Sequence, residues 1–109
     1  MKLVIAVVQD KDSNRLLEAL VSSDFKATRL ASTGGFLRAG NTTYMIGAND
    51  EQVDEVLKII KNNCKSRNKI VAPMSPMGDH VDVHTPFPVE IPIGGATVFV
   101  LPVEKFEQF

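Results

Sequence analysis

The chain opens on a short, strongly apolar run, which extends from Lys2 to Gln9 and is rich in β-branched residues. Polar residues flank this run on both sides, and the pattern predicts a central β-strand. Apolar residues then recur at helical spacing and predict a helix, which we expect Asp10 or Asp12 to cap. The apolar face of this helix consists of Leu16, Leu17, Leu20 and Val21.

Two further strands are predicted on either side of a glycine-rich segment. Residues 25–32 alternate in a way that leaves neither face purely apolar, and residues 42–47 return as a third strand. Together they predict a hairpin with the glycine-rich segment at its tip. Tyr44, the only tyrosine, falls inside the returning strand.

A second helix has the most complete set of local signals. Asn49 and Gln52 have the spacing of a capping box, which marks the start of a helix. Acidic residues fill the first turns and basic residues the last, as the helix dipole favours. Apolar residues follow at helical spacing and continue to a cysteine; they are Val53, Val56, Leu57, Ile60 and Cys64.

The last third of the chain alternates between strands and proline-rich segments. Residues 69–72 and 89–93 predict short strands, and residues 96–103 predict a strong final strand. The prolines within 73–79 and 85–88 exclude a central strand or a helix there. A long insert of this kind in a small domain is typically a functional loop.

This order of elements is that of the split βαβ, or ferredoxin-like, plan. We therefore expect one α+β domain over residues 1–109, with two helices on one face of an antiparallel sheet. Few residues remain to cover the other face, which favours oligomerisation. Phe106 and Phe109 in the C-terminal tail are expected to dock against another surface, because exposed aromatic side chains are unfavourable.

Composition narrows the class of protein. Of the 109 residues, 44% are hydrophobic and 23% charged, and the formal net charge of -1 leaves no basic surplus for long nucleic acid. Cys64 is the only cysteine, so no intrachain disulfide forms, which is typical of the cytoplasm. No apolar run approaches membrane-spanning length, and the first one reads as a strand rather than a signal peptide.

Candidate chemistry is concentrated in residues 33–43, Thr-Gly-Gly-Phe-Leu-Arg-Ala-Gly-Asn-Thr-Thr. Consecutive glycines let backbone N–H groups converge on an anion, and Phe36 offers a face for a base. The carboxamide of Asn41 can pair with the edge of adenine. This indicates a nucleotide site. From the residues alone the alternative stays open that Phe36 fills the core and that Gly40-Asn41 forms a hairpin turn.

A second polar cluster, residues 79–84, contains two histidines and two carboxylates. These are ligand types that zinc accepts, but no cysteine lies nearby and no helix frames the set. We expect no metal site here, and interpret the segment as a mobile polar loop that reorders when a ligand binds.

The chain contains a set of distinctive motifs, which are residues 1–10, 33–37, 40–43 and 45–47, Pro73, Ser75-Pro76-Met77-Gly78, Pro88-Val89-Glu90 and residues 94–103. Through these motifs the whole chain resembles the PII-like signal-transduction proteins, and among them the cyclic di-AMP receptors. The resemblance implies a homotrimer of ferredoxin-like subunits, a short loop between strands two and three, a long loop before the last strands, and no catalysis. Other PII proteins are modified on a tyrosine in a loop. Tyr44 lies in a predicted strand instead, so we do not expect that modification here.

The resemblance also implies that cyclic di-AMP binds in clefts between subunits. Phosphate contacts would come from Lys26, Thr28 and the N–H groups of Gly35, Phe36 and Leu37, with Phe36 stacking on adenine and Asn41 rejecting guanine. Several relatives have arginine at position 26. Lysine keeps the positive charge but lacks the planar guanidinium group that can bind a phosphate with two hydrogen bonds. The implied ligand-binding residues are Lys26, Ala27, Thr28, Gly35, Phe36, Leu37, Asn41, Thr42, Gly47, Phe99 and Gln108.

Three other functions compete with this one. An ATP- or ADP-binding PII-type regulator is the main alternative, which the short loop at residues 38–40 disfavours. An acylphosphatase-like enzyme is conceivable on this fold, but no Ser-His-acid or Cys-His set is evident. A constitutive trimeric interaction protein with an empty cleft is the third. The downstream protein partner is not specified by the sequence.

Overall fold

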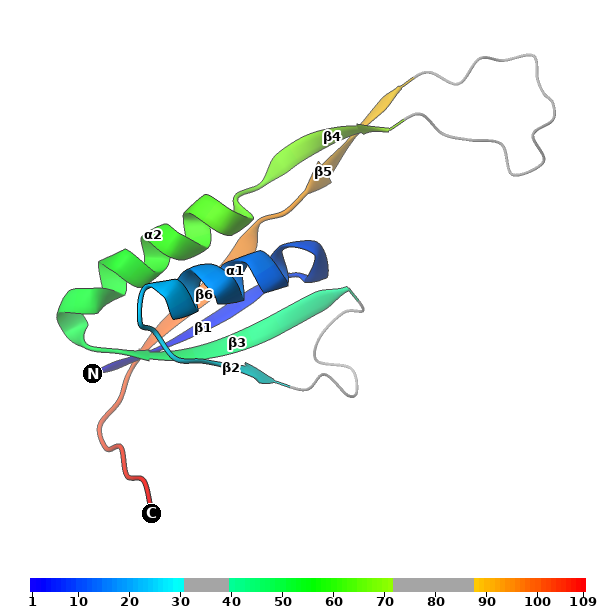
Figure 1. Ribbon diagram of the computed structural model, residues 1–109. Coiled ribbons are helices and arrows are strands. Elements are labelled where there is room, and N and C mark those ends of the chain that lie inside the picture. The colour runs from blue at the N-terminus through cyan, green and yellow to red at the C-terminus, as the bar shows by residue number, and fades with distance from the viewer. Residues whose placement is uncertain (31–39, 72–87) are drawn as a thin grey trace, which may run out of the picture.

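The computed structural model describes residues 1–30, 40–71 and 88–109. Four strands form one antiparallel sheet in the order β2-β3-β1-β6, and both helices lie on one of its faces (Figure 1). The expected ferredoxin-like α+β fold is therefore confirmed. The elements are β1 (Lys2–Gln9), α1 (Asp10–Ser22), β2 (Ala27–Leu30), β3 (Asn41–Ala48), the 3₁₀ turn η1 (Asp50–Gln52), α2 (Val53–Cys64), β4 (Arg67–Val71), β5 (Val89–Ile93) and β6 (Ala96–Pro102).

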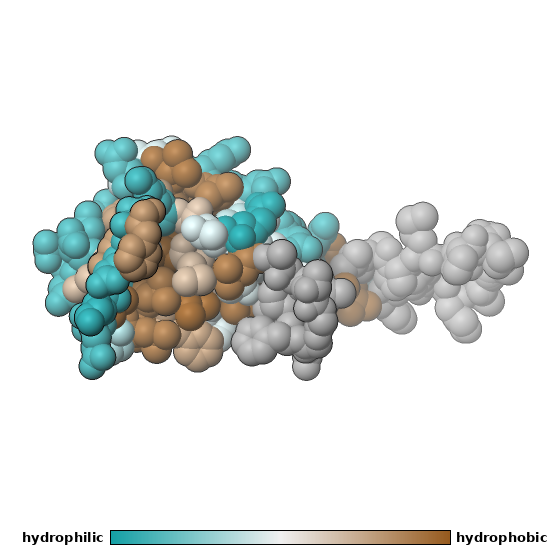
Figure 2. Space-filling model, turned by 90° about the horizontal axis from the view of Figure 1, so that it is seen from below, coloured by the Kyte–Doolittle hydropathy of each residue, from teal (hydrophilic) through white to brown (hydrophobic). Residues whose placement is uncertain are grey.

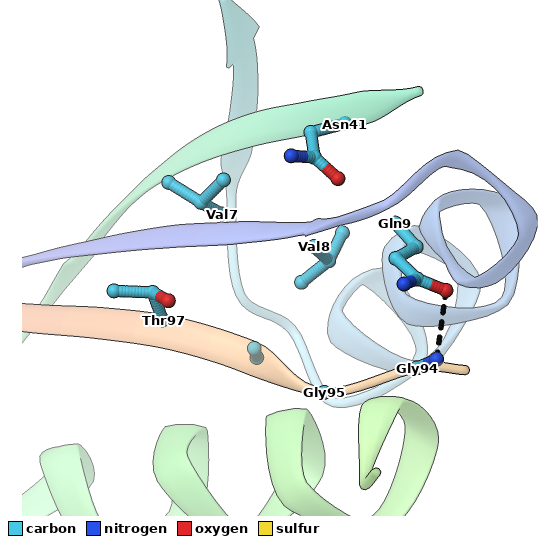
Figure 3. Close-up of a pocket in the computed structure, with 8 residues that line it drawn as sticks. Val7, Val8, Gln9, Asn41, Gly94, Gly95 and Thr97 are labelled. Carbon is cyan, nitrogen blue, oxygen red and sulfur yellow. Dashed lines mark hydrogen bonds between the residues drawn. The ribbon is translucent and has the colours of Figure 1, made fainter. Parts of the chain in front are cut away.

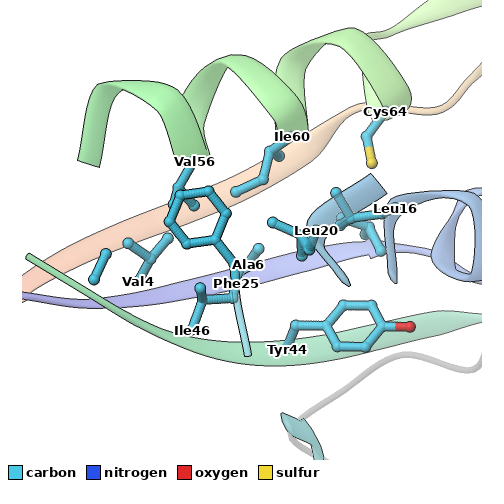
Figure 4. Close-up of a cluster of buried hydrophobic side chains, with 12 residues drawn as sticks. Val4, Ala6, Leu16, Leu20, Phe25, Tyr44, Ile46, Val56, Ile60 and Cys64 are labelled. Carbon is cyan, nitrogen blue, oxygen red and sulfur yellow. The ribbon is translucent and has the colours of Figure 1, made fainter. Parts of the chain in front are cut away.

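The hydrophobic core lies between the sheet and the two helices (Figure 4). Alternate residues of β1 point into it, as a strand with one covered face requires. On α1 the buried apolar face is narrower than predicted, because Val21 is exposed and Leu17 is only half-buried. The buried apolar residues are Val4, Ala6, Val8, Leu16, Leu20, Phe25, Tyr44, Ile46, Ala48, Val56, Ile60 and Cys64.

Tyr44 is completely buried on β3, in the strand where the sequence places it. Its hydroxyl donates to the carbonyl of Ser13 at 3.0 Å and accepts from Nη2 of Arg29 at 2.7 Å. Both hydrogen bonds satisfy the polar end of a side chain whose ring fills the core. Tyr44 therefore has a structural role in this fold.

The two helices begin differently. Before α2, the Asn49 backbone N–H donates to Gln52 Oε1 at 3.0 Å, which confirms the predicted capping box. The prediction for α1 is wrong: the N-cap is Gln9, and neither Asp10 nor Asp12 caps the helix. The reason is that β1 runs directly into α1, so both carboxylates are free for other partners: Asp10 accepts from Thr42, and Asp12 pairs with two arginines.

Strands β4 and β5 pair only with each other among the described strands and form a two-stranded arm that projects beyond the body of the molecule (Figure 1). The sequence predicts each strand but not this pairing. At the root of the arm, Gly94 and Gly95 both have positive φ, of 80° and 90°. That conformation suits glycine and turns the chain from the arm into β6.

The sheet face opposite the helices is apolar and carries no described helix (Figure 1). We call it the open face. Phe99 and Leu101 on β6 are 53% and 43% exposed, although both are apolar residues paired with the central strand β1. Figure 2 shows apolar side chains gathered over this face. Its apolar residues are Leu3, Ile5, Val7, Leu30, Met45, Phe99 and Leu101.

Candidate functional site

The pleat of the sheet decides which of its two faces each predicted ligand residue lies on. Thr28, Asn41, Gly47 and Phe99 all belong to the open face, since successive residues of a strand point to opposite sides. The predicted phosphate-binding residues 35–37 lie outside the described part of the chain. The open face therefore carries half of the predicted ligand residues that the structure describes.

Three predicted residues meet in one cavity of about 580 Å³, which we call the lysine pocket. Lys26 and Thr28 come from the chain leading into and along β2, and Gly47 from the neighbouring strand β3. The ammonium group, the hydroxyl and the approachable backbone are all suited to a phosphate. Apolar walls surround them. The remaining lining residues are Met1, Lys2, Leu3, Asp24, Phe25, Met45, Gln52, Val103 and Phe106.

Asn41 lies elsewhere, in a second cavity of about 350 Å³ that we call the amide pocket (Figure 3). Asn41 begins β3 and Gly47 lies near its end, so the two are about 20 Å apart along the strand at about 3.3 Å per residue. The two pockets therefore occupy opposite ends of the sheet. The amide pocket is lined by Val7, Val8, Gln9, Asn41, Gly94, Gly95, Ala96 and Thr97.

The other predicted residues have different surroundings. Ala27 and Thr42 point to the helix side: Ala27 packs against the core, and the Thr42 hydroxyl donates to Asp10 Oδ1 at 2.5 Å. Phe99 is exposed on the open face, and Gln108 is exposed in the tail. Neither lines a pocket with the others in the described part of this chain. Phe99 and Gln108 are thus available to a second molecule.

Sequence reasoning did not include Gln9 and Phe106 among the ligand residues. Phe106 lines the lysine pocket while remaining 63% exposed, and Phe109 at the end of the tail is fully exposed. Gln9 stands opposite Asn41 across the β1–β3 pair and lines the amide pocket. A polar residue at the end of an apolar strand is the signal that could have indicated Gln9.

Cys64 is part of the core and not of either pocket just described. Burial, and next the nearby Asp12 carboxylate, raise the pKa of its thiol to about 11, so the thiol is protonated at neutral pH. A protonated, buried thiol is a poor nucleophile. This agrees with the helix-face position that the sequence predicts for Cys64.

No cluster of three or more His, Cys, Asp or Glu residues that could hold a metal ion occurs within residues 1–30, 40–71 and 88–109. The histidine-containing segment 79–84 lies outside those ranges. In the same described part of the chain, none of the helices has the length and apolar character needed to cross a membrane.

The fold and its two pockets define a small α+β protein with room for a ligand at either end of an open apolar sheet. A family model described as cyclic-di-AMP receptor matches residues 1–109, and the chain belongs to this family. It is also similar to a solved structure, that of a functionally unknown protein from Pediococcus pentosaceus ATCC 25745. The two share 47% sequence identity with a TM-score of 0.75, over 99% of this chain and 96% of the other.

Proposed function

We propose that this chain is a non-enzymatic receptor that binds cyclic di-AMP in clefts between the subunits of a homotrimer. Membership of the cyclic-di-AMP receptor family supports the ligand. The observation that carries the proposal is the lysine pocket, where Lys26, Thr28 and Gly47 come together at the edge of an apolar face. A cyclic dinucleotide offers two singly charged phosphodiesters and two flat bases, which suit such a surface.

The chemistry divides between charge and base recognition. Lys26 supplies a positive charge and Thr28 a hydroxyl donor for one phosphate, together with the N–H groups of Gly35, Phe36 and Leu37. Phe36 stacks on one adenine, a contact worth about 1–3 kcal/mol. The Asn41 carboxamide reads an adenine edge and rejects guanine, whose O6 stands where adenine has its N6 donor.

The trimer and the cleft are supported by the open face. Phe99 is 53% exposed there in one chain, and patches of this kind commonly mark an interface between proteins. A neighbouring subunit would cover the open face and bring its own Phe99 and Gln108 to the bound ligand. A reducing compartment, the cytoplasm, suits a chain with a single, free cysteine.

Signalling requires that the ligand binds one conformation of the protein more tightly than another. We propose that the two loops predicted from the sequence, the first loop with its tip at residues 38–40 and the second, proline-rich loop before β5, reorder on binding and change a surface for a downstream protein partner. Chain order supports this proposal, because the first loop leads into Asn41 and the second leads through β5 to the amide pocket.

Isothermal titration calorimetry with cyclic di-AMP, cyclic di-GMP and ATP tests the proposal, with light scattering to give the mass of the complex. We expect one cyclic di-AMP per subunit on a trimer, and binding of cyclic di-GMP weaker by at least tenfold. No heat with cyclic di-AMP at micromolar protein would overturn the receptor function. Binding of ATP in competition with cyclic di-AMP, at equal or higher affinity, would favour an ATP- or ADP-binding PII-type regulator instead.

A further inference from the structure

Gln9 and Asn41 form a pair of carboxamides in the amide pocket. They are directly opposite each other in the antiparallel pairing of β1 and β3. Side chains in such a pair lie on the same face of the sheet, with Cβ atoms about 4.5–5.5 Å apart. Both are half-buried and both line the same cavity of about 350 Å³ (Figure 3).

The orientation of the Gln9 amide is set by the root of the arm. The backbone N–H of Gly94 donates to Gln9 Oε1 at 2.7 Å. Because an N–H group requires an acceptor, the amide oxygen has to face Gly94, and the NH₂ group has to point the other way. Figure 3 shows the Gln9 side chain extending toward Gly94, with its oxygen on the Gly94 nitrogen and its own nitrogen on the other branch of the amide. Gln9 therefore presents hydrogen-bond donors in a fixed direction, in the cavity that Asn41 also lines.

Gly94 is itself held in place, which makes it a firm anchor for Gln9. Its φ is 80°, and a Cβ built there would lie 2.5 Å from Nη1 of Arg67 and 2.7 Å from the carbonyl oxygen of Lys65. The next residue, Gly95, donates its N–H to the carbonyl of Cys64 at the end of α2. The backbone between β5 and β6 is thus packed closely against β4 and α2.

We propose that Gln9 is a second base-recognition residue and that it links the bound base to the arm. Its Nε2 donates to a ring nitrogen of the adenine whose edge Asn41 reads, while its Oε1 keeps the Gly94 hydrogen bond. Adenine has several ring nitrogens that accept hydrogen bonds, and a fixed donor beside Asn41 matches one of them. This inference rests on the proposed cyclic di-AMP function.

Two substitutions of Gln9 distinguish its role in recognising the base from its hydrogen bond to Gly94 at the root of the arm. Gln9→Glu keeps an acceptor for the Gly94 N–H but replaces the donor with a second acceptor. Gln9→Met keeps a similar length and removes both hydrogen bonds. Asn62→Asp, on the exposed side of α2, adds the same charge as Gln9→Glu away from both pockets and serves as the control. Thermal unfolding checks that each variant folds.

Calorimetry should show that Gln9→Glu and Gln9→Met each weaken cyclic di-AMP binding about tenfold or more, while Asn62→Asp binds within twofold of the unsubstituted protein. The loss in Gln9→Glu should persist at 0.5 M salt, since charge repulsion alone is strongly screened there. Wild-type affinity in Gln9→Glu, or recovery of its affinity at high salt, would overturn base recognition and leave Gln9 a support for Gly94. Wild-type affinity in both variants would remove any role for Gln9.

The link to the arm has its own readout. In ¹⁵N-labelled protein, the amide signal of Gly94 should shift on adding cyclic di-AMP and exchange more slowly with solvent. In Gln9→Met at saturating ligand, the Gly94 response should be lost. An unchanged Gly94 signal in the unsubstituted protein would contradict the link. If the unsubstituted protein binds no cyclic di-AMP at all, it is the proposed function that fails.

Discussion

Arg67 Nη2 lies 2.9 Å from Asp12 Oδ1, and this ion pair joins the first turn of α1 to the root of the β4–β5 arm. The Asp12 side chain is 1% exposed and also accepts from Arg15 Nη2 at 3.0 Å. Arg15 in turn donates to the carbonyl of Asn63 near the end of α2. One buried carboxylate therefore connects both helices and the arm.

Replacing this carboxylate should destabilise the fold. Asp12→Ala is expected to lower the free energy of unfolding by about 1–3 kcal/mol, less than for a completely buried pair because both arginines reach solvent. Urea unfolding measures the change. Glu18→Ala, at an exposed position on the same helix, should stay within about 0.5 kcal/mol of the unsubstituted protein. Equal midpoints for the two variants would contradict a structural role for Asp12.

Stability should fall in mildly alkaline solution because of Cys64. The pKa of the thiol is about 11 in the folded protein, against 9.0 for an ordinary cysteine. Between these values the unfolded chain loses the proton while the folded chain keeps it, so the unfolded state is favoured as pH rises above 9. Below pH 9 the thiol adds no pH dependence, and above pH 11 its effect is complete.

To test this, the free energy of unfolding in urea is measured at pH 7, 9 and 10 for the unsubstituted protein and for Cys64→Ala. The difference in stability between the two proteins should be constant from pH 7 to about 9 and then shrink. A difference that stays constant up to pH 10 would show that burial does not hold the proton on Cys64.

Lys26 should contribute to ligand binding through its charge. Lys26→Met is expected to weaken cyclic di-AMP binding about tenfold at low salt, and to make the remaining affinity less sensitive to salt. Lys26→Arg should bind more tightly than the unsubstituted protein, because the guanidinium can contact a phosphate with two hydrogen bonds. Calorimetry at two salt concentrations gives both results. Lys58→Met, on the exposed side of α2, controls for the loss of one positive charge; the prediction fails if it weakens binding equally.

A charge on the open face should break the proposed trimer. Leu101→Asp places a carboxylate among apolar residues of that face, where a neighbouring subunit would bury it at a high cost. Light scattering should give three times 11.9 kDa for the unsubstituted protein and a smaller mass for the variant. Val21→Asp, at a 59% exposed position on α1, should remain a trimer. A trimeric Leu101→Asp would exclude the open face as the interface.

The root of the arm should be intolerant of side chains. Gly94→Ala combines a positive φ with a contact of 2.7 Å between the new Cβ and the backbone carbonyl oxygen of Lys65, and is expected to cost about 2–4 kcal/mol of stability. Gly40→Ala has a similar φ of 93° but open space around the new Cβ, so it should cost only about 1 kcal/mol. Urea unfolding compares the pair, and equal costs would show that the packing at Gly94 is not limiting.

Local patterns predicted most of the elements. The apolar run of β1 has the same bounds in the structure, and the Asn49–Gln52 box stands at the start of the second helix. The cap of α1 was predicted wrongly because spacing alone cannot show that a carboxylate has a distant arginine as its partner. Asp12 meets Arg67, 55 residues away, only after the chain folds.

The structure brings some of the predicted ligand residues together and separates others. Lys26, Thr28 and Gly47 do share a pocket. Asn41 belongs to another pocket at the far end of β3, beside Gln9 and Gly94. Chain distance does not reveal this grouping, because the pleat and the register of the sheet decide which residues share a face and an end.

The sequence by itself determined the family, the α+β order of elements and the residue types available to a phosphate and a base. Those properties depend on residue types and their local spacing, which can be read directly from the linear sequence. Only the tertiary structure decided which side chains stand on the open face, that Asp12 pairs with Arg67 at the root of the arm, and that Gln9 lies between Asn41 and Gly94. These relationships join residues far apart in the chain, and the pairing of β1 with β3 and β6 brings them together.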